Sequence, residues 1–108
     1  MIVASFQFQV KRDKRAEFVR AAENFVSTLR QSPGCVDCHL LSDCELRSRF
    51  TVQSRWDGRT PLRRFLQSND FRALLGTRIL LHVPPHVCID EVVRCTRLPG
   101  RGPTVPGW

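Results

Sequence analysis

The side chains best suited to chemistry are the three histidines and the cysteines near the first of them. The run Cys35-Val36-Asp37-Cys38-His39 matches the C-x-x-C-H pattern through which c-type haem is attached covalently. Cys44 lies close by in the sequence, so the same segment offers thiols and an imidazole to a metal ion. His39, His82 and His86 are candidate catalytic bases, because histidine titrates near neutral pH.

The expected geometry of this segment argues against haem or metal binding. Residues 35–43 are predicted to form a strand, and side chains three positions apart on a strand point to opposite faces. The first residues lack the basic flank and long apolar stretch of an export signal, which c-type haem attachment would require. We expect no cofactor and no metal, a cytoplasmic protein, and five cysteines that stay reduced.

The elements that must position these residues follow from hydropathy patterns. Alternation predicts strands over residues 2–10 and 49–57, and apolar residues predict a last strand over 87–95. Helical spacing predicts a helix over 14–31 with Asp13 as its N-cap. A second helical region begins at Thr60-Pro61, with Thr60 as N-cap, and has another cap at Ser68-Asn69-Asp70. With the strand at 35–43, the order predicts a ferredoxin-like α+β fold, a four-stranded antiparallel sheet with both helices on one face.

Length and charge restrict the function further. The 108 residues predict one domain, residues 1–97, followed by a Pro/Gly-rich tail, residues 98–108. No apolar run approaches the roughly 20 residues that span a bilayer, so no membrane association is expected. The net charge is +7, but the basic residues are scattered among acids and are densest at residues 11–15. We interpret them as a solvated surface, and we do not expect nucleic acid to be the partner.

Several short motifs together resemble the antibiotic biosynthesis monooxygenase family of dimeric α+β barrels. They are Ser32-Pro33-Gly34-Cys35 after the first helix, a third strand with Phe50 and Trp56, Phe65-Leu66-Gln67-Ser68 before Asp70-Phe71, and the pair Pro84-Pro85. The resemblance implies a homodimer in which two sheets pack face to face. The interface would use the sheet face opposite the helices, which carries Val3, Ser5, Gln7, Thr51, Gln53 and Arg55.

The resemblance also implies an activity. Members of the family oxidise flat, electron-rich aromatic molecules such as quinols with dioxygen, and they use no metal, flavin or haem. We therefore expect a cofactor-independent monooxygenase-like protein; the alternative is a non-catalytic dimer of the same fold that binds or senses a small apolar molecule. The expected substrate pocket is lined by Phe6, Val52, Trp56, Leu62, Phe65, Phe71 and Leu75.

The sequence departs from the family where its relatives place polar groups. Val52 occupies the position of an asparagine in the monooxygenase branch, and Phe65 that of a common histidine. The haem-degrading branch needs an asparagine, a tryptophan and a histidine where this chain has Phe6, Phe65 and Leu75, so we reject haem degradation. Two further cysteines, Cys88 and Cys95, are expected to be small buried hydrophobes.

Overall fold

The computed structural model describes residues 1–98, without the side chains of Leu75 and Thr77. Its elements, in chain order, are strand β1 (Ile2–Gln9), 3-10 turn η1 (Arg12–Lys14), helix α1 (Arg15–Arg30), strands β2 (Cys35–Ser42) and β3 (Arg49–Trp56), helices α2 (Arg59–Leu66) and α3 (Asn69–Leu75), 3-10 turn η2 (Gly76–Leu80) and strand β4 (His86–Glu91). The predicted tail lies outside the described residues, apart from Leu98.

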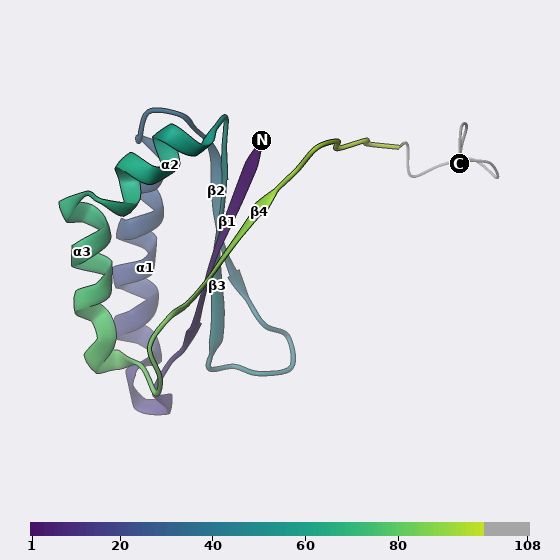
Figure 1. The fold of residues 1–108 in the computed structure, drawn as a ribbon. Coiled ribbons are helices and arrows are strands. Elements are labelled where there is room, and N and C mark those ends of the chain that lie inside the picture. The colour runs from purple at the N-terminus through teal and green to yellow at the C-terminus, as the bar shows by residue number, and fades with distance from the viewer. Residues whose placement is uncertain (99–108) are drawn as a thin grey trace.

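The four strands form one antiparallel sheet in the order β2-β3-β1-β4. The helices α1, α2 and α3 cover one face of this sheet, and within residues 1–98 the other face carries no helix (Figure 1). This arrangement confirms the predicted ferredoxin-like α+β fold. The alternation of β1 explains it, because Ile2, Ala4, Phe6 and Phe8 all point to the helix side and are buried.

The core between sheet and helices is built largely from aromatic rings. Phe18 packs between Phe8 and Phe50 in tilted contacts, with ring centroids 5.1 and 5.2 Å apart. Helix α1 contributes Phe18, Phe25 and Leu29 from one apolar stripe, at the spacing expected of an amphipathic helix. The stripe fixes which face of α1 lies on the sheet.

The helix starts differ from two of the predicted caps. Asp13 lies inside the turn η1 instead of capping α1, which begins at Arg15 with no side-chain cap. Thr60 lies within the first turn of α2, because the N-cap of that helix is Gly58, two residues before the predicted cap. The cap at Ser68 is confirmed, since its hydroxyl accepts the backbone N–H of Phe71 at 3.3 Å.

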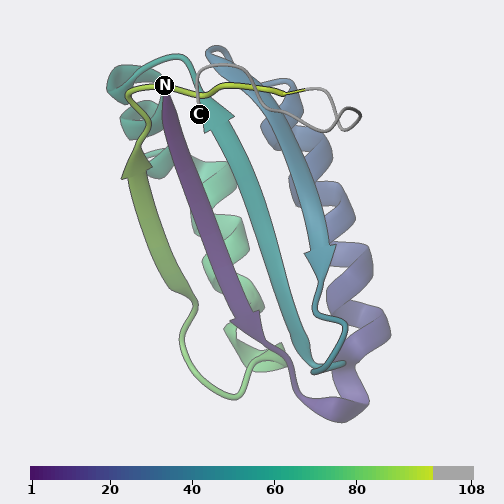
Figure 2. The same cartoon turned by 90° about the vertical axis from the view of Figure 1, so that its right-hand side faces the viewer.

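The last strand is shorter than predicted. The sequence pattern predicts it over residues 87–95, but β4 ends at Glu91, which pairs with Ile2 at the first paired position of β1. The N–H of Val92 makes one more bond, to the carbonyl of Met1 at 2.8 Å. The following residues then have no strand to pair with, and they run across the end of the open face in Figure 2.

A tight turn holds the end of α1 against the start of α2. Gly34 has φ +86°, and a Cβ built on it would lie 2.3 Å from Cβ of Pro61. The N–H of Asp57 donates to the carbonyl of Gly34 at 3.0 Å. Glycine is needed here both for the backbone conformation and for the close approach of α2.

Candidate functional site

Most of the side chains predicted to line a pocket lie in the packed interior. Trp56, Phe6 and Val52 have no exposed surface, and Phe65 is 4% exposed. The centroid of Phe65 lies 5.6 Å from that of Trp56 and 6.0 Å from that of Phe71. These rings fill the space between one another, so the aromatic group is part of the core. The side chain of Leu75 lies outside the described residues.

Trp56 is fixed by a buried hydroxyl. Its indole Nε1–H donates to Oγ of Ser54 at 2.9 Å, and Oγ of Ser54 donates to the carbonyl of Ala4 at 3.1 Å. Ser54 has no exposed surface and is the buried polar side chain of the described core. The polar atom of Trp56 is thus satisfied inside the protein.

An apolar cavity of about 380 Å³ lies between the sheet edge and α2. Its walls are Ile2 of β1, Ile89 of β4, and Leu62 and Leu66 on one side of α2. Leu62 is the predicted pocket residue that reaches it. The volume lies within the range of about 300–1,000 Å³ that is usual for small-molecule sites.

Charged side chains surround the mouth of this cavity. Arg59 and Arg63 come from α2 and Glu91 from the end of β4. Nη2 of Arg59 lies 2.5 Å from Oε2 of Glu91, in a pair whose side chains are 70% and 60% exposed. The site therefore combines an apolar interior with guanidinium groups and a carboxylate at the rim.

The three candidate histidines lie in different places. His39 is exposed on β2, borders a hollow of about 430 Å³ with Glu23 and Arg30, and has Nε2 4.0 Å from Asp37. His82 lies near the opposite end of the sheet from α2, and His86 is exposed on β4 and points to the open face. None of the three lines the cavity beside α2.

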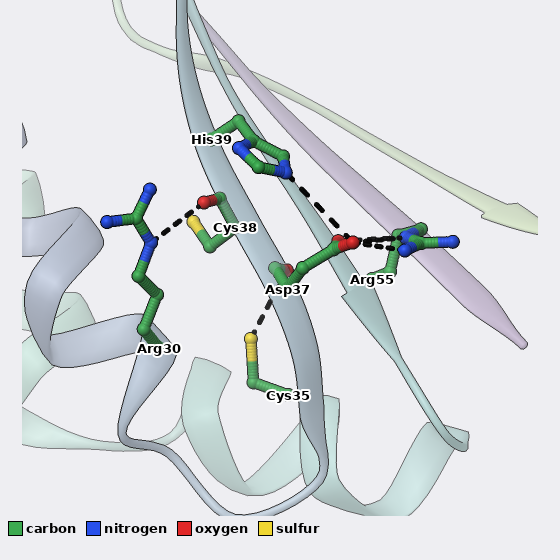
Figure 3. Close-up of polar contacts among 6 residues, drawn as sticks. All are labelled: Arg30, Cys35, Asp37, Cys38, His39 and Arg55. Atoms are coloured by element: carbon green, nitrogen blue, oxygen red, sulfur yellow. Dashed lines mark hydrogen bonds and ion pairs between the residues drawn. The ribbon is translucent and has the colours of Figure 1, made fainter.

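Cys35 and Cys38 lie on the same face of β2, contrary to the sequence argument. The register of β2 against β3 shifts between Cys35 and Asp37, and this bulge leaves Val36 as an extra residue. Figure 3 shows both thiols on the side of Arg30, with His39 and Asp37 on the other. Burial raises the pKa of Cys38 to about 12, which keeps it a thiol.

The expectation for two other cysteines is wrong. Cys88 and Cys95 are exposed, because Cys88 points to the open face of the edge strand and Cys95 follows the end of the sheet. Residues 1–98 contain no group of three or more His, Cys, Asp or Glu side chains that could hold a metal ion. The same part of the chain has no helix long and apolar enough to cross a membrane.

An ion pair links two strands on the open face. Nε of Arg55 donates to both carboxylate oxygens of Asp37 at 2.8 Å, and its Nη2 also contacts Oδ2 (Figure 3). These hydrogen bonds hold the pKa of Asp37 below its ordinary value, against an opposing effect of burial. The pair neutralises the charge of both side chains within this face.

The fold and the cavity define a class, a ferredoxin-like α+β domain with a small-molecule-sized cavity between its layers. Residues 1–76 match the model of the antibiotic biosynthesis monooxygenase family. The chain belongs to that family, as its short motifs indicate. No curated protein matches the sequence.

Solved structures share the fold at low sequence identity. A protein from Deinococcus radiodurans, provisionally classed as an antibiotic biosynthesis monooxygenase, is 15% identical with a TM-score of 0.85, over 93% of this chain and 100% of that one. A conserved protein from Methanosarcina mazei Go1 is 20% identical with a TM-score of 0.78, over 83% and 90%. A variant of SnoaB, a cofactor-independent oxygenase from Streptomyces nogalater, is 17% identical with a TM-score of 0.75, over 87% and 94%.

Sequence reasoning missed most of the cavity. Ile2, Leu66 and Ile89 look like ordinary core residues in the sequence, and Arg59, Arg63 and Glu91 look like solvated charges. The pairing of Ile2 with Glu91 brings two of these residues together, but it can be recognised only when the register of β4 against β1 is known.

Proposed function

We propose that this protein is a cofactor-independent monooxygenase acting on a flat aromatic or quinol-type molecule bound in the cavity beside α2. The observation that carries the proposal is the apolar cavity walled by Ile2, Leu62, Leu66 and Ile89, with guanidinium groups at its mouth. Membership of the antibiotic biosynthesis monooxygenase family supports the reaction class.

The chemistry needs a base and a group that stabilises an anion. A substrate CH₂ flanked by aromatic rings loses a proton, and the resulting carbanion supplies electrons to dioxygen. One oxygen atom then becomes the product carbonyl, and the other leaves as water with the two substrate hydrogens. In this proposal Glu91, which lines the mouth and is paired with Arg59, accepts the proton, and Arg63 holds the anionic oxygen.

The histidines remain alternative bases. His86 is carried by β4, the strand that also supplies Ile89 to the cavity wall, although its side chain points to the other face. His39 and His82 would need a substrate bound elsewhere. Separate glutamine variants of the three histidines and of Glu91 identify the base, because its loss lowers kcat more than it changes KM.

Oxygen uptake with a panel of quinols and anthrones tests the enzyme. We expect turnover that Leu66→Trp abolishes, since an indole would fill part of the cavity. The control is Ile79→Trp, at an exposed position on η2, which should keep wild-type rates. Uptake that is absent with every compound, or equal in the two variants, would contradict the proposal.

The alternative function is a binding or sensing protein of the same fold. It is favoured by the core, in which the buried polar side chain among the described residues, Ser54, is already bonded to Trp56 and Ala4. No catalytic group therefore reaches a substrate from the interior of the described structure. Binding of panel compounds in the absence of oxygen uptake, blocked by Leu66→Trp, would establish this alternative.

We also propose that the protein is a cytoplasmic homodimer formed through the open sheet face. That face carries Val3, Ser5 and Leu41 without a covering helix, and its Asp37–Arg55 pair is neutral as a unit. A sheet with one uncovered, partly apolar face is stabilised by packing on a second layer. The five free thiols support a reducing compartment.

A further inference from the structure

Three segments far apart in the sequence meet at the end of the sheet opposite α2. The end of β1, the β2–β3 hairpin and the connector before β4 come together at the lower end of Figure 2. Backbone hydrogen bonds join them, from Val10 N–H to Ser48 at 2.8 Å, from Lys11 N–H to Leu80 at 2.8 Å, and from His82 N–H to Gln9 at 2.8 Å. The backbones of the three segments are therefore held in a fixed arrangement.

These segments enclose a hollow of about 650 Å³, which we call the basic basin. It is lined by Lys11, Arg12, Arg15, Glu45, Leu46, Arg47, Ser48 and His82. Four permanently cationic side chains thus face one carboxylate. Within residues 1–98, the side chains of Lys11, Arg12 and Arg47 make no ion pair, so their charges are not neutralised by the protein.

Hydrogen bonds and a ring contact position Arg15 and the hairpin loop at the border of the basin. Nε of Arg15 donates to the carbonyl of Arg47 at 3.2 Å, and its guanidinium carbon lies 5.2 Å from the ring centroid of Phe50. The hairpin loop is fixed separately, because Asp43 Oδ1 accepts the N–H groups of Glu45 and Leu46 at 2.7 and 2.9 Å. Arg15 is thus positioned before any ligand arrives, which lowers the entropy cost of binding.

We infer that the basic basin binds a small molecule bearing two or more phosphate groups. Arginine presents a planar set of N–H donors that matches phosphate oxygens, and here three arginines and a lysine converge on one concave space. A nucleic-acid surface would instead follow a backbone as an extended stripe. The β2–β3 hairpin, which borders the basin, lies at the other end of the sheet from α2 (Figure 1), and the basin shares no lining residue with the cavity beside α2.

Calorimetric titration of the full chain with orthophosphate, pyrophosphate and tripolyphosphate, at matched ionic strength, tests the inference. We expect affinity to rise with the number of phosphates. In the double variant Arg12→Gln/Arg47→Gln, tripolyphosphate should bind at least about tenfold more weakly, a loss of ~1.4 kcal/mol. Thermal melting of each variant without ligand establishes that it is folded.

The matched control is Arg64→Gln/Arg94→Gln, which removes two exposed arginines outside the basin and changes net charge equally. It should keep wild-type affinity for tripolyphosphate. An equal loss in both double variants would show diffuse attraction by net charge and would overturn the site. Absence of tripolyphosphate binding at low salt would also overturn it, and so would duplex DNA binding more tightly than tripolyphosphate.

Discussion

Ser54 is a residue whose importance is visible only in three dimensions. In the sequence it is a serine in the alternating pattern of β3, while in the structure it joins the indole of Trp56 to the backbone of β1. A buried N–H that loses its acceptor costs more than the net value of one hydrogen bond. The hydroxyl therefore supports the largest side chain of the core.

Ser54→Ala should lower the free energy of unfolding by about 1–3 kcal/mol, because Nε1–H of Trp56 would stay buried without its partner. Urea unfolding followed by circular dichroism measures the change. Ser42→Ala, at an exposed position of β2, is the control and should stay within about 0.5 kcal/mol of wild type. Equal effects of the two variants would contradict the role of Ser54.

Asp37 should make stability depend on acid. Its pKa is lower in the folded protein than in the unfolded chain, so its contribution is complete above the unfolded value of about 3.9 and disappears as pH falls through the folded value. The stability difference between wild type and Asp37→Asn should therefore shrink on acidification below about pH 4, as measured by urea unfolding across pH.

Arg55→Gln provides the cross-check for the Asp37–Arg55 pair, since the hydrogen bond from the guanidinium of Arg55 is the main cause of the lowered pKa of Asp37. The acid-dependent difference should be absent when Asp37→Asn is introduced into the Arg55→Gln background. If it persists there, another group holds the pKa of Asp37 low.

At the scale of elements, periodic hydropathy patterns predict the fold, but they do not predict a strand bulge or the residue at which a strand ends. The alternation in residues 2–10 and the stripe of α1 indicate the layer order directly. The bulge at Val36 has no periodic signal, so the opposite-face argument for Cys35 and Cys38 is wrong. The end of β4 depends on where β1 begins, because Glu91 pairs with Ile2 and β1 offers no earlier residue, so it is a property of two strands together.

The turn between α1 and β2 gives the prediction at this scale. Gly34→Ala should cost at least about 2 kcal/mol, because alanine resists positive φ and its methyl group would overlap Pro61. Chemical unfolding measures the loss. Gly76→Ala is the contrasting substitution, since a methyl group there would meet no atom within 4 Å and φ is −65°. It should be neutral or stabilising by about 0.5 kcal/mol.

At the scale of the whole molecule, the uncovered sheet face leads to a prediction about assembly. Light scattering should give twice the mass of the chain, and Leu41→Asp should shift it toward the monomer, because Leu41 is 45% exposed on that face. Ile79→Asp, which adds the same charge on η2, should remain dimeric. A wild-type protein that is monomeric at all concentrations would refute the proposed interface.

The candidate site is harder to predict from the sequence than the fold, because it depends on the arrangement of the whole molecule. Motif positions such as Trp56 and Phe65 indicate the family, but in this chain their side chains pack against each other in the core. The cavity arises where α2 and the edge strand β4 leave space beside Ile2, and such space depends on how separate elements are placed. A single sequence specifies the elements more directly than the gaps between them.

The bond between Trp56 and Ser54 also gives the protein an optical label. The chain contains no tyrosine and two tryptophans, Trp56 and Trp108. With Trp108 replaced by phenylalanine, ultraviolet fluorescence would arise from one indole held in a dry aromatic interior. The wavelength of its emission maximum would then report whether water has entered the core, without any added dye.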